Sequence, residues 1–409
     1  MDDQAHVIEL SSWADAREAF RQRDLRQGLY DEGRDLMADV IVNLHAQPHT
    51  ARRRLENRLF RRDTFFHFER VVIPQTIDAM LEPHLREGRV DLNPLARRIM
   101  MSLATDIAGV DRAEGTEAEF EVLYHQMGRL SRASTVLHAT GDKQAIIDDG
   151  NAALREFEER FFAPSKARRV ALLEDFDAHR IDEDDLPRDV LVTLLRNQDR
   201  LELPADVVLR EVAYYPWVGS HSTSNAFVHA AHHVFAWIAA HPDDADRLHD
   251  DPFMLQRFVH ESLRLHPASP VARRFAMDDV ELPGGAVIPR DSLVVIDLVA
   301  ANRDPLVFGP TAQEFDPFRE IPDDVTAWGL TFGSGFHACL GQELAGGLPA
   351  GDAADPDQHL FGAITVMART MLAHGARPDP DRPPQRDANT VRPNWGSYPV
   401  VFSAVRQPA

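Results

Sequence analysis

The longest helical pattern in this chain runs from Pro204 to His241, and it constrains the fold more than any other segment. A helix of that length extends for about 55 Å at roughly 1.5 Å per residue. Proline is favourable in the first turn of a helix, and Pro242 marks the end of this one. Pro216 lies inside the pattern and predicts a kink, because proline removes one backbone hydrogen bond.

The rest of the chain is mostly helical in period between its prolines. A chain of 409 residues with 44% hydrophobic content can bury a large core, although length alone is typical of two or three domains. Short strand candidates occur at residues 7–10, 280–288, 293–296 and 400–402. No internal repeat or long linker divides the chain. We therefore predict one domain over residues 1–409 that is mainly α with small β-sheets.

Cys339 is the only cysteine, and it lies in the glycine-rich loop Phe332-Gly333-Ser334-Gly335-Phe336-His337-Ala338-Cys339-Leu340-Gly341. Such a backbone can fold closely over a flat ligand with its amides directed at the sulfur. A disulfide within the chain is impossible, and structural zinc or iron–sulfur sites need further thiols. We favour a metal ligand. The alternatives are a small buried hydrophobe and a nucleophile assisted by His337.

A second motif is the pair Glu261 and Arg264. Residues three apart share a face of a helix, so these two side chains can form a charge-assisted pair. The apolar neighbours Leu263 and Leu265 indicate that the pair is buried, and a buried pair needs its remaining groups satisfied. Arg319 is the candidate for that role. The alternative is a surface ion pair of under about 1 kcal/mol.

These motifs, in this order, resemble the cytochrome P450 family from about Val7 to the C-terminus. The cysteine loop resembles the haem-thiolate signature, His260-Glu261-Ser262-Leu263-Arg264 resembles the Glu-x-x-Arg element, and residues 301–305 and 315–319 resemble the segment that completes its ion network. The resemblance implies the fold of that family and haem b as the cofactor. It also implies that Cys339 is the iron ligand, that Phe332, Gly333 and Gly341 belong to the haem-binding loop, and that Glu261, Arg264 and Arg319 support this loop.

The resemblance further implies positive groups around the two haem propionates. His49 and Arg53 lie four residues apart in a segment that resembles the helix contacting one propionate, so they face the same way. Arg274 and His337 match the other propionate positions. For each of these residues taken alone, a solvated charge is the alternative.

The interior of the long helix departs from the family pattern. Where most members have Ala-Gly-x-acid-Thr, this chain has Val218-Gly219-Ser220-His221-Ser222-Thr223. We expect His221 and Ser222 to manage proton delivery, with Thr223 as a second candidate. An ungapped count back from Glu261 instead places Thr223 at the glycine and Asn225-Ala226 at the acid and alcohol. His229, His232 and His233 share a face, but a histidine cluster at the edge of the core is favoured over a metal site.

Two further departures concern the ends of the pattern. Only 48 residues precede His49, so we expect the first helix and strands of the family to be missing and residues 13–24 to form a helix. After the cysteine, a helix begins at Gln342, and residues 346–349 and 352–357 interrupt it before an apolar period resumes at Leu360. We expect an acidic insertion there.

The resemblance implies a monooxygenase for a small or medium-sized organic substrate, with electrons from NAD(P)H delivered by a ferredoxin or flavoprotein. Arg54, Arg58 and Arg61 are expected on one helical stripe that meets this partner; the alternative is a solvated face. The pocket is expected to involve residues 120–162, 268–272, 394–398 and the segment before His49. The alternative functions are a peroxygenase, isomerase or oxidative coupling enzyme, and a non-catalytic haem sensor.

Charge and hydropathy limit the partners and the location. The formal net charge of −21 argues against nucleic acid as a partner. No apolar run approaches the roughly 18 residues that a membrane span needs, and no signal-peptide pattern is present. We expect a soluble cytoplasmic protein without a membrane partner, where a lone thiol stays reduced.

Overall fold

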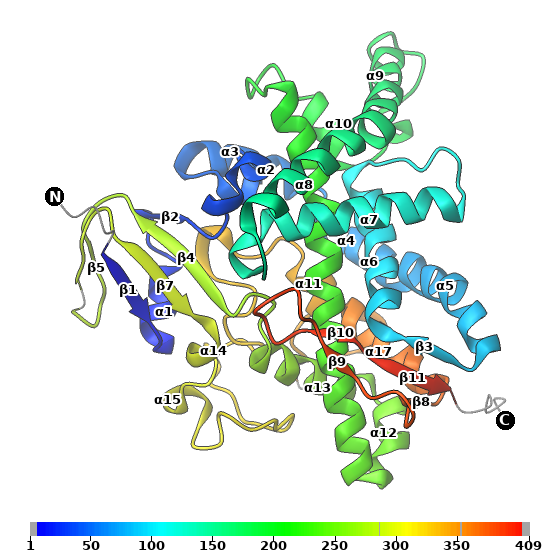
Figure 1. Ribbon diagram of the computed structural model, residues 1–409, viewed down its shortest axis with the longest axis vertical. Helices are drawn as coiled ribbons and strands as arrows, with labels where there is room; N and C mark the ends of the chain where they lie inside the picture. The colour runs from blue at the N-terminus through cyan, green and yellow to red at the C-terminus, as the bar shows by residue number, and fades with distance from the viewer. Residues whose placement is uncertain (1–5, 286, 352–353, 403–409) are drawn as a thin grey trace.

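The computed structural model describes residues 6–285, 287–351 and 354–402. Figure 1 shows α11 (Ala205–Ala240) passing through the middle of the molecule, between a sheet near the N-terminus and a smaller sheet near the C-terminus. The other helices are α1 (Trp13–Ala19), α2 (Arg34–Met37), α3 (Ala46–Glu56), α4 (Arg62–His67), α5 (Ile73–Glu87), α6 (Leu92–Ala108), α7 (Glu117–Ser134), α8 (Lys143–Phe157), α9 (Ala163–Asp177), α10 (Val190–Leu195), α12 (Ala245–Asp250), α13 (Pro252–Leu265), α14 (Leu298–Ala301), α15 (Pro305–Phe308), α16 (Gln342–Gly346) and α17 (Ala363–Ala373).

The strands form small sheets at the periphery. The largest has the order β1 (Val7–Leu10), β7 (Leu293–Asp297), β4 (Val271–Ala276), β2 (Leu25–Gln27), and only the β1 to β7 pairing in it is parallel. A second sheet has the order β3 (Arg89–Asp91), β11 (Pro399–Phe402), β8 (Ala376–Pro378). Two-stranded pairs join β5 (Val280–Glu281) to β6 (Val287–Ile288) and β9 (Gln385–Arg386) to β10 (Trp395–Ser397).

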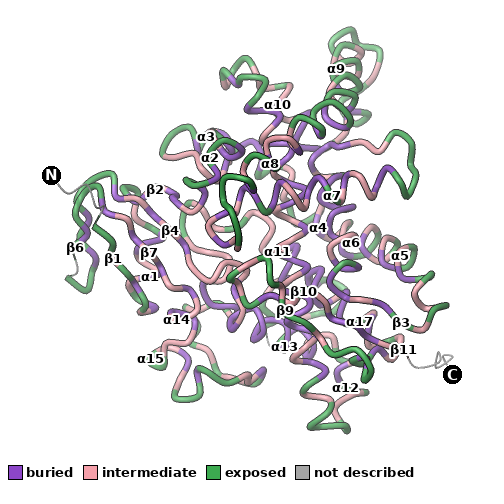
Figure 2. Tube along the Cα trace, in the orientation of Figure 1, coloured by how far each residue is buried: buried purple, intermediate pink, exposed green. Residues whose placement is uncertain are grey.

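The long central helix matches the sequence prediction closely, and its burial explains its stability. Buried residues gather around α11, whereas α9 is mostly exposed (Figure 2). The helix packs most extensively on α6, and a methyl group at Gly219 would meet the Cβ of Ala104 on α6 at 3.3 Å. A small residue at position 219 therefore lets the two helices approach.

Pro216 lies inside α11, which is helical on both sides of it. The predicted kink stays a prediction, but the hydroxyl groups that follow are bonded back to the helix. Ser220 Oγ donates to the Pro216 carbonyl oxygen over 2.6 Å, and Ser222 Oγ donates to that of Val218 over 2.6 Å. These additional bonds tie the turn after the proline to the helix backbone.

The interruption after the cysteine is an excursion between α16 and α17, and residues 352 and 353 of it lie outside the described residues. Its two ends touch: Leu348 N donates to Leu360 O over 2.8 Å, and a Cβ at Gly362 would meet Gly347 N at 2.3 Å. The carboxylate of Glu69 accepts from Gly362 N over 2.7 Å at the start of α17. The excursion is therefore closed at its base.

Three boundaries differ from the sequence prediction. The first helix ends at Ala19 rather than Asp24, and the strand expected over 280–288 is two short strands joined by a turn. The expected stripe of Arg54, Arg58 and Arg61 on one helix is wrong, because α3 ends at Glu56 and α4 begins at Arg62. All three arginines are nevertheless exposed.

Candidate active site

A cavity of about 330 Å³ lies between the cysteine loop and α11. Its walls come from segments far apart in the sequence: the stretch before α3, α3 itself, α6, α11, β4 and the loop from Thr331 to Gly341. Cys339 and its neighbours Phe332, Gly333, His337 and Gly341 all line it. The described lining includes arginine and histidine but no aspartate or glutamate, so its charged groups are cations.

The Cys339 thiol is exposed toward this cavity and has no disulfide partner. The surrounding protein still desolvates it, and this raises the pKa of the thiol, although the Gly341 backbone and the Arg53 charge oppose the rise. The loop is held by the Cys339 amide, which donates to the Phe332 carbonyl oxygen over 2.9 Å. At Gly335, which has φ of +67°, a Cβ would meet the Phe20 carbonyl oxygen at 2.7 Å.

The structure brings together the four residues predicted to meet the propionates. The rings of His49 and His337 are 4.1 Å apart, and Arg53 donates to the Ala338 carbonyl oxygen over 2.5 Å. His49 is buried, its Nε2 has no hydrogen-bond partner, and burial lowers its pKa to about 4. Arg274 is also buried, and it donates to the Gln27 side-chain oxygen over 2.7 Å without an acidic partner in the described chain. Burial lowers the pKa of Arg274 to about 10.

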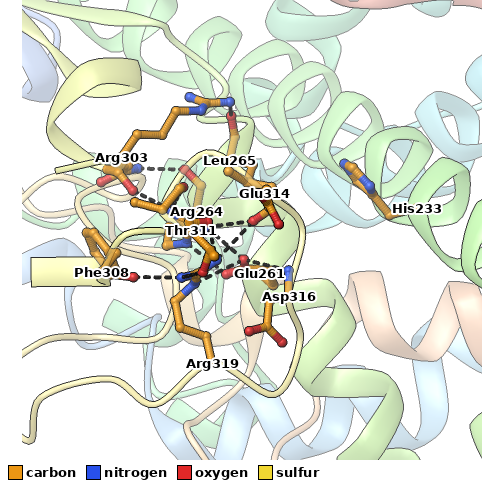
Figure 3. Close-up of polar contacts among 12 residues, drawn as sticks. His233, Glu261, Arg264, Leu265, Arg303, Phe308, Thr311, Glu314, Asp316 and Arg319 are labelled. Atoms are coloured by element: carbon orange, nitrogen blue, oxygen red, sulfur yellow. Dashed lines mark hydrogen bonds and ion pairs between the residues drawn. The ribbon is translucent and has the colours of Figure 1, made fainter. Parts of the chain in front are cut away.

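Glu261, Arg264 and Arg319 also come together (Figure 3). Arg264 Nε and Nη2 each donate to Glu261 over 2.7 Å, and both residues are buried. Arg319 Nε donates to the same carboxylate over 3.4 Å and binds the Phe308 carbonyl oxygen over 2.6 Å. The pair is therefore a buried network rather than a surface ion pair.

Asn302, to which the sequence analysis gave no role, connects this network to the cysteine loop. Its side-chain amide donates to the Arg264 carbonyl oxygen over 2.9 Å and to Thr331 Oγ1 over 3.1 Å. Its Oδ1 accepts from Leu330 N over 2.7 Å. The motif 301–305 contained this residue, but the segments that it joins are distant in the chain.

The three α11 candidates differ in position. Ser222 and Thr223 line the cavity, whereas His221 does not. Ser222 donates its hydroxyl to the Val218 carbonyl oxygen, and Thr223 Oγ1 makes no hydrogen bond to the described residues. His221 Nδ1 lies 3.0 Å from the Trp217 carbonyl oxygen, so that nitrogen is the donor, and burial lowers the pKa of the ring well below its usual value.

The cavity lining does not decide the register of the motif, because Gly219 and Ser222 of one register and Thr223 and Ala226 of the other all line it. Asn225, the acid equivalent in the second register, does not. The first register therefore places the hydroxyl of Ser222 at the alcohol position on the wall, whereas the second places Ala226 there and leaves Thr223 at the glycine position.

The histidines of the second half of α11 pack against one another and their neighbours. His229 stacks on His266 with ring centroids 4.2 Å apart, and His233 Nε2 lies 2.8 Å from His266 Nε2. Burial lowers the pKa of His229 to about 3. Nowhere in the described ranges are three or more histidine, cysteine, aspartate or glutamate side chains placed to hold a metal ion. This group is a packed histidine cluster.

The expected pocket segments are only partly on the cavity wall. Residues 268, 269, 271 and 272 line it, as do Tyr30 and Ile41 from the segment before α3. The expectation for residues 120–162 and 394–398 is wrong for this cavity, because α6 and α11 themselves supply that part of the wall. Sequence reasoning missed Met100, Leu103 and Tyr214.

Comparisons with known proteins agree with this geometry. The family model of cytochrome P450 matches residues 14–346, and the chain therefore belongs to the cytochrome P450 family. The chain is 27% identical over 305 residues to cytochrome P450 4F4 of Rattus norvegicus, which covers 68% of this chain and 51% of that protein. It thus spans about half the length of that relative.

Two other comparisons concern a bacterial relative and a solved structure. Cyclooctat-9-en-7-ol 5-monooxygenase of Streptomyces melanosporofaciens is 25% identical over 348 residues, with 78% of this chain and 71% of that protein covered. The crystal structure of CalO2 has a TM-score of 0.70 at 22% identity, over 98% of this chain and 93% of that one. The likeness to CalO2 confirms the predicted fold class.

The family implies haem, and the residues present fit it. The cavity offers a thiol, the unpartnered His49 Nε2 and the buried guanidinium of Arg274, which together suit a flat cofactor that carries carboxylates. None of the described helices combines the length and apolar character that crossing a membrane requires.

Proposed function

We propose that this chain is a haem-thiolate monooxygenase that inserts one oxygen atom from dioxygen into a small or medium-sized organic substrate. The observation that supports this most strongly is the Cys339 thiol facing a cavity whose charged lining is entirely cationic in the described chain. Arg53 and Arg274 match the two propionate charges, so the protein supplies the counter-charges that haem b needs.

Haem bound to a cysteine thiolate supplies dioxygen activation, with the thiolate favouring O–O cleavage. The residues of this chain hold the group and exclude water. Cys339 is the iron ligand, while His49 and His337 offer ring nitrogens to the propionate edge. The electrons come from NAD(P)H through a separate ferredoxin or flavoprotein. A cytoplasmic location suits a lone reactive thiol.

Proton delivery falls to the hydroxyl groups on α11. Thr223 Oγ1 faces the cavity without a hydrogen-bond partner in the described residues, so it can hold a proton at that atom. The Ser222 hydroxyl lines the same wall but is engaged with the Val218 carbonyl oxygen. His221 lies behind them, neutral at physiological pH, and can take part only through a relay.

The reduced carbon-monoxide difference spectrum tests the proposal directly. A Soret band at the thiolate position is expected from the native protein and is expected to be lost in Cys339→Ser, with thermal unfolding measured to show that the variant is folded. NADPH consumption by the reconstituted system should depend on substrate and yield an oxygenated product. A native protein without the thiolate band would overturn the assignment.

A second candidate is oxidation driven by hydrogen peroxide. It is favoured by the described cavity lining, which holds no carboxylate that could stand in for the missing acid on α11. Turnover with peroxide as fast as with reduced ferredoxin would support this candidate. A non-catalytic haem sensor would give the thiolate band without product from either oxidant.

A further inference from the structure

Arg392, in the loop between β9 and β10, has no ion-pair partner among the described residues, although the charge of Asp387 acts on it. Its Nε is buried without a hydrogen-bond partner, and its Nη1 reaches the Ala268 carbonyl oxygen only at 3.5 Å. Burial lowers the pKa of this arginine to about 10. The residue as a whole is partly buried, and a desolvated guanidinium that lacks an ion pair is stabilised by an anion.

The loop that carries Arg392 is fixed in place. Val391 N donates to the His138 carbonyl oxygen over 2.8 Å, and Thr390 Oγ1 donates to the same oxygen over 2.9 Å. The His138 ring in turn lies 3.2 Å from Ser269 Oγ. Arg392 is therefore held by a preformed contact between two loops rather than by a mobile tail.

Arg392 does not itself line the cavity, but it lies against residues that do. Ala268, which accepts from Arg392, lines the cavity, and so does Ser269. Burial raises the pKa of the Tyr30 phenol on the same wall, and the Arg392 charge opposes that rise more strongly than the Arg274 charge does. The guanidinium thus acts electrostatically on the cavity wall.

Arg97 on α6 adds a second positive charge nearby. Its Nη2 donates to Asn93 Oδ1 over 3.1 Å, its Nε is buried without a partner, and it forms no ion pair within the described chain. Asn93 donates to the Trp395 carbonyl oxygen, which connects α6 to the strand after Arg392. The charges of Arg97 and Arg392 both act on His221.

Much of the cavity wall is apolar, although Ser222, Thr223 and Ser269 also line it. Met100, Leu103 and Ile107 of α6 line it. Since Arg53 and Arg274 already match the two propionate charges, Arg392 is left without an anion even when the cofactor is bound. The cavity therefore suits a molecule with an apolar body and one negative group.

We propose that Arg392, with Arg97 adding positive potential, binds a carboxylate of the substrate, so that the substrate is an apolar organic acid. This inference rests on the proposed function, because it concerns the same cavity. The guanidinium would donate paired hydrogen bonds to the carboxylate and fix one end of the molecule. The apolar body would then extend toward the cysteine side of the cavity.

The experiment uses the haem-loaded protein and matched probes that differ only in charge: nonanoate against 1-nonanol, and 3-phenylpropanoate against 3-phenylpropan-1-ol. Dissociation constants are measured by equilibrium dialysis. In at least one pair the acid should bind about tenfold or more tightly than the alcohol. Arg392→Gln should remove that preference while leaving the affinity for the alcohol unchanged, and Arg392→Lys should retain part of it.

Arg377→Gln changes an exposed arginine in the same C-terminal segment and should keep the native preference. A native protein that binds no acid more tightly than its alcohol, or an Arg392→Gln variant that keeps the preference, would overturn the inference. Loss of haem with an unchanged acid preference in Arg392→Gln would also overturn it and assign Arg392 to a propionate. The carbon-monoxide spectrum separates the two proposals. A native protein with an intact thiolate band but no preference for acids refutes the carboxylate site and leaves the haem-thiolate function standing.

Discussion

Asn302 and Leu330 are joined by a hydrogen bond of 2.7 Å, in which the Leu330 amide donates to Asn302 Oδ1. The amide nitrogen of the same side chain donates to the Arg264 carbonyl oxygen and to Thr331 Oγ1. One fully buried asparagine thus connects the end of α13 to the start of the Cys339 loop. The ion network therefore supports the cysteine loop through this side chain.

Asn302→Ala should destabilise the protein and weaken haem retention. The substitution leaves the Leu330 amide and the Arg264 carbonyl oxygen buried without partners, which costs roughly 2–4 kcal/mol in unfolding free energy. Denaturant unfolding and the ratio of Soret to protein absorbance after purification measure the two effects. Asn57→Ala, at an exposed position, should change neither. Native stability in Asn302→Ala would show that Asn302 does not carry this connection.

Asn302 also shows why a motif can be recognised in the sequence although the role of each of its residues cannot be predicted. The segment 301–305 was matched as a unit, but the importance of Asn302 depends on Gly329, where a Cβ would meet Asn302 Oδ1 at 2.4 Å. That relation exists only after two loops have packed together. Glu261 and Arg264, by contrast, meet within one helical turn, so their pairing was predictable from spacing.

Gly362→Ala should destabilise the base of the excursion between α16 and α17. Gly362 has φ of +84°, and a Cβ there would meet Gly347 N at 2.3 Å and Gly346 C at 2.5 Å. Together, the backbone strain and the overlap with backbone atoms are expected to lower the free energy of unfolding by at least about 2 kcal/mol. Thermal unfolding measures the loss.

Gly128→Ala is the matched control for that substitution. Gly128 lies inside α7, and a Cβ there meets nothing within 4 Å, so alanine should raise stability by about 0.5–1 kcal/mol. Opposite signs for the two variants are expected. If Gly362→Ala unfolds at the native temperature or above, the closed base of the excursion is not required for stability.

Glu56 should make stability depend on pH near neutrality. The carboxylate is fully buried on α3, where it accepts the Tyr215 hydroxyl, and burial raises its pKa from 4.5 to about 7. Glu211 lies nearby and accepts a hydrogen bond from Arg52 over 2.8 Å, while burial and the Glu56 charge raise the pKa of Glu211 well above its usual range. A carboxyl group that binds its proton more tightly in the folded state stabilises that state at low pH. This contribution is lost as the pH rises through about 7.

Glu56→Gln stays neutral at every pH and should lack this contribution. The unfolding free energy of the native protein relative to the variant should therefore increase as the pH falls below 7, by up to about 1.4 kcal/mol per pH unit. Denaturant unfolding between pH 5.5 and 8 measures it. For Glu87→Gln, at an exposed position, the curve of unfolding free energy against pH should be parallel to that of the native protein. Parallel curves for Glu56→Gln would contradict the prediction.

Thr223→Ala should uncouple NADPH consumption from product formation. Thr223 offers the hydroxyl that has no partner in the described residues, whereas the Ser222 hydroxyl is bonded to the Val218 carbonyl oxygen. Product formed per NADPH should fall by about tenfold or more in Thr223→Ala and much less in Ser222→Ala. An equal fall in both variants would indicate that the Ser222 hydroxyl leaves its carbonyl during turnover.

The candidate site was predictable where its residues are close in sequence to a motif. Five predicted residues line the cavity: His49, Arg53, Arg274, His337 and Cys339. Each could be predicted because it lies within a local sequence motif. The α6 part of the wall and the position of Arg392 beside Ala268 were not predictable, because both depend on the packing of distant segments. The arginine stripe failed for a local reason, since the helix ends at Glu56.

Charge reversal at Arg54, Arg58 and Arg61 should slow reduction by a ferredoxin. The three side chains are exposed, and only Arg61 has an ion pair within the described chain, at 3.6 Å to Asp63 with both groups about two-thirds exposed. Arg53, the neighbour of Arg54, reaches the Ala338 carbonyl oxygen beside the cysteine. An acidic partner docked on these arginines would therefore lie next to the loop that holds Cys339.

Because the chain has a formal charge of −21, a local positive surface should matter most at low salt, where screening is weak. The triple change to glutamate should lower the rate of reduction at least about tenfold at low ionic strength, and the difference should shrink as salt rises. Stopped-flow reduction under carbon monoxide measures it. The matched control reverses the exposed Arg180, Arg188 and Arg200, far from the cysteine loop in sequence. An equal slowing by both triple variants would mean that net charge, rather than this surface, governs docking.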